Sequence, residues 1–263
     1  LYKELAKNNV QDAFLYHILK STSIEAVPSW ISKNSKALSK FYEVINPALA
    51  NIRTTKTLPS SWGYDGPVTA NYSSDHYLEA IGNTDAQSKR NGPWYYYFDN
   101  GTRQAEGSYK SGDKTGVWKY YNTSGYLTAH ENYDTGEIML YTSKGELSER
   151  YKLKDEKVQG EVLVYYPCGA LRERLQFMEG NRHGKAEFYY IDGTLGELKF
   201  YAEGVLQGSF ESFFEDGRKR VVASYDQDEL TGKFTRYHRT GSLDVEGQYE
   251  KGLATGLWTF YHD

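Results

Sequence analysis

Glycine recurs at a fixed interval through residues 92–263, and this period limits what the chain can fold into. Seven times a glycine is followed nine residues later by another, and an eighth unit opens at Gly256. The opening glycines are Gly92, Gly116, Gly136, Gly160, Gly184, Gly208 and Gly232, and six of the seven intervals between successive units are 24 residues. A fixed period of this length predicts a supersecondary unit stacked on itself rather than a conventional enzyme domain.

Each unit carries apolar residues at fixed positions after its opening glycine, which is counted as position zero. Position two is apolar in every copy, as in Trp94 and Trp118, and position five is aromatic in every copy. Aromatic runs such as residues 94–98, bounded by turn pairs such as Asn100-Gly101, are typical of strands joined by tight turns. Each unit is therefore predicted to be a β-hairpin.

A loop centred on the Asn-Gly pair sets the register of the hairpin. Position two then faces position fifteen, and position zero faces position seventeen, which places Gly92 opposite Tyr109. We expect the ring to cover the backbone that the opening glycine leaves bare, so that this glycine has a packing role. The second turn, at residues 111–114, is expected to bring Tyr109 opposite Trp118 and so to link neighbouring units.

The one irregular interval, from Gly116 to Gly136, is 20 residues long. Losing four residues around a turn removes two from each arm, so no side chain changes face. Tyr133 and Ile138 are therefore still expected to meet across the shortened turn.

Position five is predicted to lie on the opposite face of the sheet from position two, so that both faces carry apolar columns. The position-five column supplies the candidate partner-binding residues, because aromatic side chains are common anchors of interfaces. These residues are Tyr97, Tyr121, Tyr141, Tyr165, Tyr189, Phe213, Tyr237 and Tyr261.

At these residues the chain resembles the bacterial MORN-repeat-variant family, which includes antitoxin-component-like proteins. The segment with Gly116, Trp118, Tyr121 and Gly125 is a close match, and residues 232–256 are another. The resemblance implies a mainly β fold, an elongated single-layer antiparallel β-hairpin repeat array of about 7.5 units over residues 92–263. It implies a scaffold rather than a particular activity.

Two units depart from the family pattern at the second turn. Glu156 and Asp228 stand where most of the other units have a glycine, which leaves the geometry of these two turns open.

Residues 1–60 have no such period and are predicted to form a small α-helical N-terminal cap. Apolar residues at helical spacing, such as Val10, Phe14 and Ile18, predict helices over about residues 2–20 and 35–53. Such a cap would cover the first edge of an open sheet. Residues 61–91 are predicted to be a linker with a degenerate repeat, since Gly66-Pro67-Val68 echoes Gly92-Pro93-Trp94.

Charge divides the chain at about the same boundary. Residues 1–60 contain eight Lys and Arg against four Asp and Glu, whereas the remainder contains 23 against 31. An acidic array argues against nucleic acid and against anionic lipid, because both are bound through cationic side chains. No stretch of 18 apolar residues occurs, so no direct membrane span is expected.

No residue pattern predicts catalytic, metal or cofactor-binding residues, so an enzyme is not expected. His238 and His262 occupy the same position in consecutive units, but equivalent strands lie about 10 Å apart and the ligands of one metal lie about 2 Å from it. Neither a phosphate-binding glycine motif nor a nucleophile elbow is found in the sequence.

These observations predict a non-catalytic repeat scaffold that mediates protein–protein interaction or assembly of a larger complex, along the sheet surface or at its terminal strand. The alternative is a glycan-binding surface built on the aromatic columns. The family label adds a third hypothesis, an antitoxin-type partner of an unidentified toxin. Family habit and the absence of an initiating Met favour a periplasmic, cell-surface or secreted protein, with a cytoplasmic one as the alternative.

Overall fold

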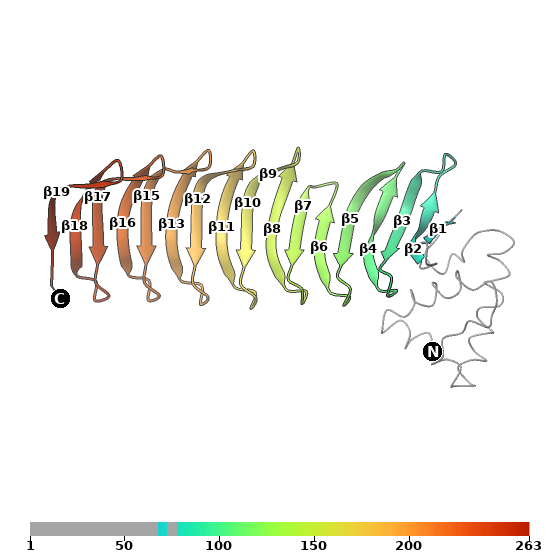
Figure 1. The fold of residues 1–263 in the computed structure, drawn as a ribbon, viewed down its shortest axis with the longest axis horizontal. Coiled ribbons are helices and arrows are strands. Elements are labelled where there is room, and N and C mark those ends of the chain that lie inside the picture. Colours follow the sequence, from blue (N-terminus) through green and yellow to red (C-terminus); the bar gives the residue numbers. More distant parts are fainter. Residues whose placement is uncertain (1–67, 73–77, 263) are drawn as a thin grey trace, which may run out of the picture. The chain divides into compact units, whose positions relative to one another are not determined.

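The computed structural model describes residues 68–72 and 78–262. The helices predicted at residues 2–20 and 35–53 lie outside these ranges. The described residues contain strands and turns and no helix. They fall into two compact units, each of which contains several of the repeats. The first unit ends at Asp134 and the second begins at Thr135. From this point on, a single hairpin repeat is called a repeat and the word unit is kept for these two parts. Within each unit the strands form one layer of antiparallel hairpins, which confirms the prediction of a mainly β, open hairpin sheet (Figure 1).

The first unit contains six strands, each paired with the next along the chain. They are β1 (Val68–Tyr72), β2 (Leu78–Thr84), β3 (Arg90–Tyr97), β4 (Arg103–Lys110), β5 (Asp113–Tyr121) and β6 (Leu127–Asn132). The hairpin of β1 and β2 lies where the sequence predicts a degenerate repeat.

The second unit continues the same pattern, with antiparallel pairs of neighbouring strands from β7 to β19. The short strands β9 and β14 directly precede β10 and β15 and pair with the same neighbours, β8 and β13. The strands are β7 (Glu137–Tyr141), β8 (Leu147–Lys154), β9 (Lys157–Val158), β10 (Gly160–Tyr165), β11 (Leu171–Met178), β12 (Asn181–Tyr189), β13 (Leu195–Ala202), β14 (Val205–Leu206), β15 (Gly208–Phe213), β16 (Lys219–Asp226), β17 (Glu229–Tyr237), β18 (Leu243–Glu250) and β19 (Leu253–Phe260).

The predicted register within a repeat is confirmed. In the first unit Gly92 pairs with Tyr109 and Trp94 with Gly107. In the second unit Gly232 pairs with Tyr249 and Phe234 with Gly247. The predicted meeting of Tyr133 and Ile138 joins residues of different units and stays a prediction.

The first turn of each repeat is a three-residue loop with a bulge. The amide of Phe98 donates to the carbonyl of Thr102 at 2.9 Å, and the amide of Gly101 donates to the carbonyl of Phe98 at 2.8 Å. Gly101 has a φ of 81°, as a type I turn closed by a left-handed residue requires. The Asn-Gly pair therefore supplies the last two residues of the loop.

The predicted packing role of the opening glycine is wrong. Every opening glycine has a positive φ, from 62° at Gly116 to 88° at Gly184. A Cβ added to Gly116 would meet nothing within 4 Å, so no ring covers this position. Between β4 and β5 the register shifts between Glu106 and Ser108, and the extra residues on β5 include Gly116, so this glycine lies in a β-bulge. Glycine is needed here because the bulge takes a left-handed backbone that other residues adopt only at a cost.

Rings do cover a glycine, but at position fifteen. A Cβ added to Gly107 would overlap the indole of Trp118, which belongs to the following repeat. Trp258 covers Gly247 in the same way. The flat ring over bare backbone that the sequence suggests is therefore present, and it joins one repeat to the next.

The second turns of the 24-residue repeats keep one geometry, including the two that lack glycine. Ser111 and Gly112 have φ values of 53° and 101°, and the corresponding Asp155 and Glu156 have 49° and 62°. Positive φ at both central residues defines the two-residue hairpin turn with Asn-Gly preference. Glu156 thus holds a conformation that costs an ordinary residue roughly 1–2 kcal/mol.

Candidate functional site

The position-five column lies on the opposite face from position two, as predicted. The hydroxyl of Tyr121 donates to Glu106 Oε1 at 2.8 Å, whereas Trp118 lies over Gly107, the next residue of that strand. Successive residues of a strand point to opposite faces, so the two aromatic positions do too.

The eight predicted partner-binding residues of this column differ in exposure. Tyr97 is 4% exposed and belongs to the core, whereas Tyr261 is 37% exposed. The six others are partly buried: Tyr121, Tyr141, Tyr165, Tyr189, Phe213 and Tyr237. Like Tyr121, Tyr261 donates its hydroxyl to a carboxylate of the neighbouring strand, that of Glu246, at 2.8 Å. A binding role for the column stays a prediction.

The first unit presents a second aromatic surface on its position-two face, and we call it the tyrosine face. It consists of Trp94, Tyr96, Tyr109, Trp118, Tyr120 and Tyr133. Trp94 and Trp118 are each 1% exposed, so they form the floor, and the tyrosines lie above them. Tyr109 meets Trp118 edge to face with ring centroids 4.9 Å apart. The predicted ring contact between repeats is confirmed, although the residue directly opposite Tyr109 is Lys114 rather than Trp118.

One cation lies over the rings in each of the two repeats of this face. The Arg90 guanidinium is 4.7 Å from the centroid of the Trp94 ring, and its Nη1 donates to the Tyr109 hydroxyl at 3.2 Å. Lys114 Nζ is 4.5 Å from the Trp118 ring and donates to the Tyr120 hydroxyl at 2.7 Å. Both cations stand two residues before an opening glycine, a signal that the sequence reasoning missed. Cation–π contacts of this kind contribute about 0.5–2 kcal/mol.

The phenolic hydroxyls of the tyrosine face are tied to one another. Those of Tyr96 and Tyr109 lie 2.8 Å apart, and those of Tyr120 and Tyr133 lie 3.3 Å apart. Glu131 Oε2 accepts from both Tyr120 and Tyr133, at 3.1 and 2.8 Å. Burial, followed by the hydrogen bond to the neighbouring tyrosine, raises the pKa of Tyr96 and that of Tyr120. Both hydroxyls therefore keep their protons at neutral pH and remain able to donate.

Small residues flank the exposed part of this face. Tyr96 pairs with Ala80 of β2 on one side and with Ala105 of β4 on the other. Tyr120 likewise lies between Ala105 and Ala129 of β6. These flanking side chains are short, and the two tyrosine rings between them are partly exposed.

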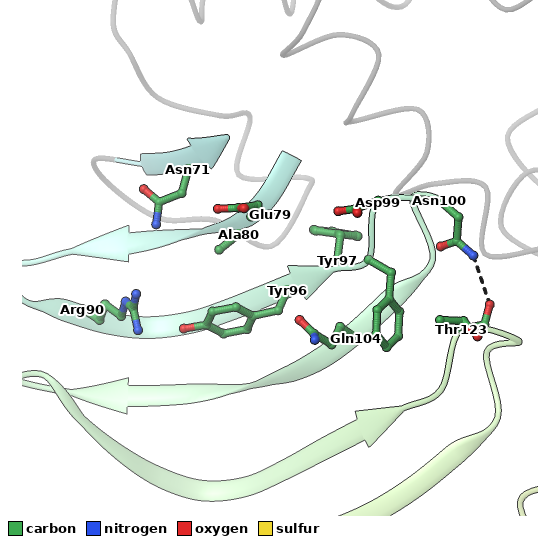
Figure 2. A pocket seen from close by; sticks show the side chains of 11 residues that line it. Asn71, Glu79, Ala80, Arg90, Tyr96, Tyr97, Asp99, Asn100, Gln104 and Thr123 are labelled. Atoms are coloured by element: carbon green, nitrogen blue, oxygen red, sulfur yellow. Dashed lines mark hydrogen bonds between the residues drawn. The ribbon is translucent and has the colours of Figure 1, made fainter. Parts of the chain in front are cut away.

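A hollow of about 630 Å³ opens beside Tyr96. Figure 2 shows Ala80 beside the Tyr96 ring and the hydroxyl of Tyr96 pointing toward Arg90. Polar groups from the first strands and from two loops surround the ring, and the described lining residues are Asn71, Glu79, Ala80, Arg90, Tyr96, Tyr97, Phe98, Asp99, Asn100, Gln104 and Thr123. Asn100 Nδ2 donates to the Thr123 carbonyl at 3.2 Å and joins the two loops (Figure 2).

The second unit does not repeat this arrangement. At the position of Ala105 and Ala129, three of its repeats have the carboxylates Glu149, Glu173 and Glu197, and the next two have Val221 and Val245. At the position of Tyr96 the same repeats have Leu140, Val164, Phe188, Ser212 and Arg236. One of its core clusters is aliphatic, formed by Val162, Val164, Leu175 and Ala186, whereas its last repeats hold the rings of Phe234, Tyr249 and Trp258. Alternating alanine and tyrosine therefore distinguish the first unit.

The last strand of the second unit carries the most exposed of the large apolar side chains. Leu257 is 85% exposed, Leu253 71% and Phe260 68%. Tyr261 of the position-five column follows directly. Within the second unit, β19 pairs with β18.

Two other features are absent within residues 68–72 and 78–262. No group of three or more His, Cys, Asp and Glu side chains could hold a metal ion there. In the same ranges, no helix has the length and apolar character needed to cross a membrane.

Comparison with known proteins bears on the repeats. No curated protein shows significant similarity to the chain. Among solved structures, the crystal structures of TcdB2-TccC3-TEV and TcdB2-TccC3 match 70% and 74% of this chain, both at 11% identity, with TM-scores of 0.22 and 0.20. That of TcdB2-TccC3-Cdc42 matches 71% at 12% identity with a TM-score of 0.19. The chain spans 12%, 14% and 14% of the length of these proteins, and similarity at this level indicates neither a shared fold nor a shared function.

The family model described as the MORN repeat variant matches residues 90–111 and 230–251. These segments cover β3 with β4 and most of β17 with β18, which are the hairpins whose register was predicted. The chain therefore carries MORN repeat variant segments, one in each of its two units.

Proposed function

We propose that this protein is a non-catalytic repeat scaffold that binds a partner protein, and that β19 with Tyr261 forms the binding surface. The observation that supports this most directly is the exposure of Leu253, Leu257 and Phe260 within one strand of eight residues. Exposed apolar side chains gathered on one element are typical of interaction surfaces, whereas single ones are ordinary.

The chemistry of this strand suits a protein partner. Tyr261 offers an aromatic anchor on the face of the strand that Leu253 and Leu257 share, and Phe260 offers one on the other face, because successive residues of a strand point to opposite faces. The strand is held in place from one side by the β18 ladder, from Val245 opposite Phe260 to Glu250 opposite Leu253. A partner would therefore meet a surface that is already ordered, which reduces the entropy lost on binding.

The test is affinity recovery of the full chain from its native cells after cross-linking, with mass spectrometry to locate the linked residues. We expect cross-links to concentrate on residues 253–262. Leu257→Lys should abolish recovery of the cross-linked partner, because it places a charge between Leu253 and Tyr261 on the face that these side chains share. Ile191→Lys is the matched control, since Ile191 is 64% exposed and lies in a loop of the same unit. Equal recovery with Leu257→Lys and with Ile191→Lys would contradict the proposal.

A further inference from the structure

The hollow in the first unit has a rigid aromatic wall. The Tyr96 ring lies 6.1 Å from Trp94 and 5.9 Å from Trp118, centroid to centroid, and its hydroxyl is fixed by Tyr109. Ala80 and Ala105, which flank it in register, are only 3% and 6% exposed. A ligand that enters beside this ring meets a surface that needs no rearrangement, which favours binding.

Uncharged and acidic hydrogen-bonding groups line the rim. Asn71 and Gln104 supply amides, which both donate and accept, and Glu79 and Asp99 supply carboxylates, which accept. Within the described residues, no hydrogen bond or ion pair engages the side chains of Glu79 and Gln104, and both are exposed. Asn100 is already held by Thr123 and fixes the loop beside them.

The aromatic wall and the polar rim together limit which classes of ligand can bind in the hollow. An anionic ligand is disfavoured, because Glu79 and Asp99 repel it and Arg90 is occupied over the rings and by the Tyr109 hydroxyl. A wholly apolar ligand is disfavoured too, because it would strip water from the rim groups without replacing their hydrogen bonds. A simple cation would pair with Glu79 and Asp99 but would leave the donors of Asn71 and Gln104 unused. A molecule with an apolar face for the ring and many hydroxyls for the rim engages all of these groups.

We propose that the hollow beside Tyr96, which Ala80 and Gln104 also line, binds a short neutral saccharide. The volume lies within the range of about 300–1,000 Å³ that is typical of small-molecule sites. The C–H face of a sugar ring packs against Tyr96, and its hydroxyls bond to Gln104, Glu79, Asp99 and Asn71. This site is separate from β19 and does not depend on the protein-binding function proposed above.

The neighbouring repeat extends the same surface. Tyr120 lies between Ala105 and Ala129, two strands from Tyr96 and thus about 10 Å away. A saccharide of several units that lies across β3, β4 and β5 therefore reaches a second ring of the same kind. We expect longer saccharides to bind more tightly than single sugars for this reason.

The test uses the full chain labelled with ¹³C at alanine methyl groups. Cellobiose, maltose, lactose and N,N′-diacetylchitobiose are each titrated to about 10 mM. This concentration reveals binding as weak as a dissociation constant in the millimolar range. We expect at least one of them to shift the methyl signals of Ala80 and Ala105 in a saturable manner. Ala223, a buried alanine of the second unit, should not move. Unmoved Ala80 and Ala105 signals with all four sugars, or an equal shift at Ala223, overturn the proposal.

Matched variants separate recognition from folding. Gln104→Ala and Asp99→Asn change exposed side chains at the rim and should each weaken binding at least about tenfold, a loss of about 1.4 kcal/mol. Arg220→Ala and Glu215→Gln change exposed residues at the same repeat positions in the second unit and should leave binding unchanged. Similar losses in both sets would show that the sugar does not occupy this hollow.

Discussion

The indole of Trp118 lies directly over Gly107, in the space that a Cβ of that residue would occupy. Gly107 belongs to one repeat and Trp118 to the next, so the contact joins repeats. Trp118 Nε1 also donates to the carbonyl of Ser108 at 3.0 Å, which fixes the ring over its glycine. Packing between neighbours thus depends on a missing side chain as much as on a large one.

Gly107→Ala should destabilise the first unit by about 1–3 kcal/mol, the usual effect of overpacking, because the new methyl displaces the Trp118 ring. Urea unfolding followed by tryptophan fluorescence measures the change. In a Trp118→Leu background the same substitution should have a much smaller effect, since the ring is gone. Equal effects in both backgrounds would mean that the ring does not cover Gly107.

Glu156→Gly should raise the free energy of unfolding by about 1 kcal/mol, because Glu156 has a φ of 62° and glycine adopts that conformation without strain. Gly180 occupies the same position in the next repeat with a φ of 88°, and its Cβ would meet nothing closer than 3.9 Å. Gly180→Glu should therefore lose a similar amount. Thermal denaturation of the pair measures both, and changes of the same sign would contradict the turn geometry.

Tyr97→Ala should lower the free energy of unfolding by about 3 kcal/mol or more, the range for aromatic residues removed from a core, because Tyr97 is 4% exposed. Tyr261→Ala should cost much less and should instead reduce recovery of the cross-linked partner. The comparison tests whether the position-five column is a single binding surface. Equal destabilisation by the two substitutions would assign the whole column to packing.

Tyr120 should make stability depend on alkaline pH. Burial raises the pKa of Tyr120 from its ordinary value of 10.0, so the unfolded chain loses this proton at lower pH than the folded chain. The stabilising contribution is therefore complete below pH 10.0 and is lost as the pH rises above it. Urea midpoints measured on both sides of this pH should fall less steeply in Tyr120→Phe than in the parent. Tyr126→Phe, at a tyrosine that is 50% exposed, is the control and should follow the parent curve.

The hairpin architecture could be predicted because the sequence repeats it. Tight turns recur at one spacing, and the pairing of Trp94 with Gly107 follows from the centre of the loop. The role of the opening glycine could not be read in the same way, because a glycine required by a positive φ and a glycine covered by a ring are identical in sequence. The bulge that contains Gly116 distinguishes the two, and it is visible only once the pairing of β4 with β5 is known.

The hollow beside Tyr96 was beyond sequence reasoning for a related reason. Its lining residues Ala80, Tyr96 and Gln104 come from three strands, and their adjacency depends on the registers of two separate hairpins. Alanine is also too common to mark a site by itself. The cations Arg90 and Lys114 did carry a signal, since both precede an opening glycine by two residues.

The most direct test of this account is the NMR signal of the Gly107 α-protons in the full chain. If the Trp118 indole covers Gly107, ring currents shift these protons strongly upfield, and nuclear Overhauser effects connect them to the indole protons. Trp118→Leu should return them to ordinary glycine positions. Ordinary α-proton shifts in the parent chain, with no Overhauser effect to Trp118, would contradict the stacking of repeats on which the account depends.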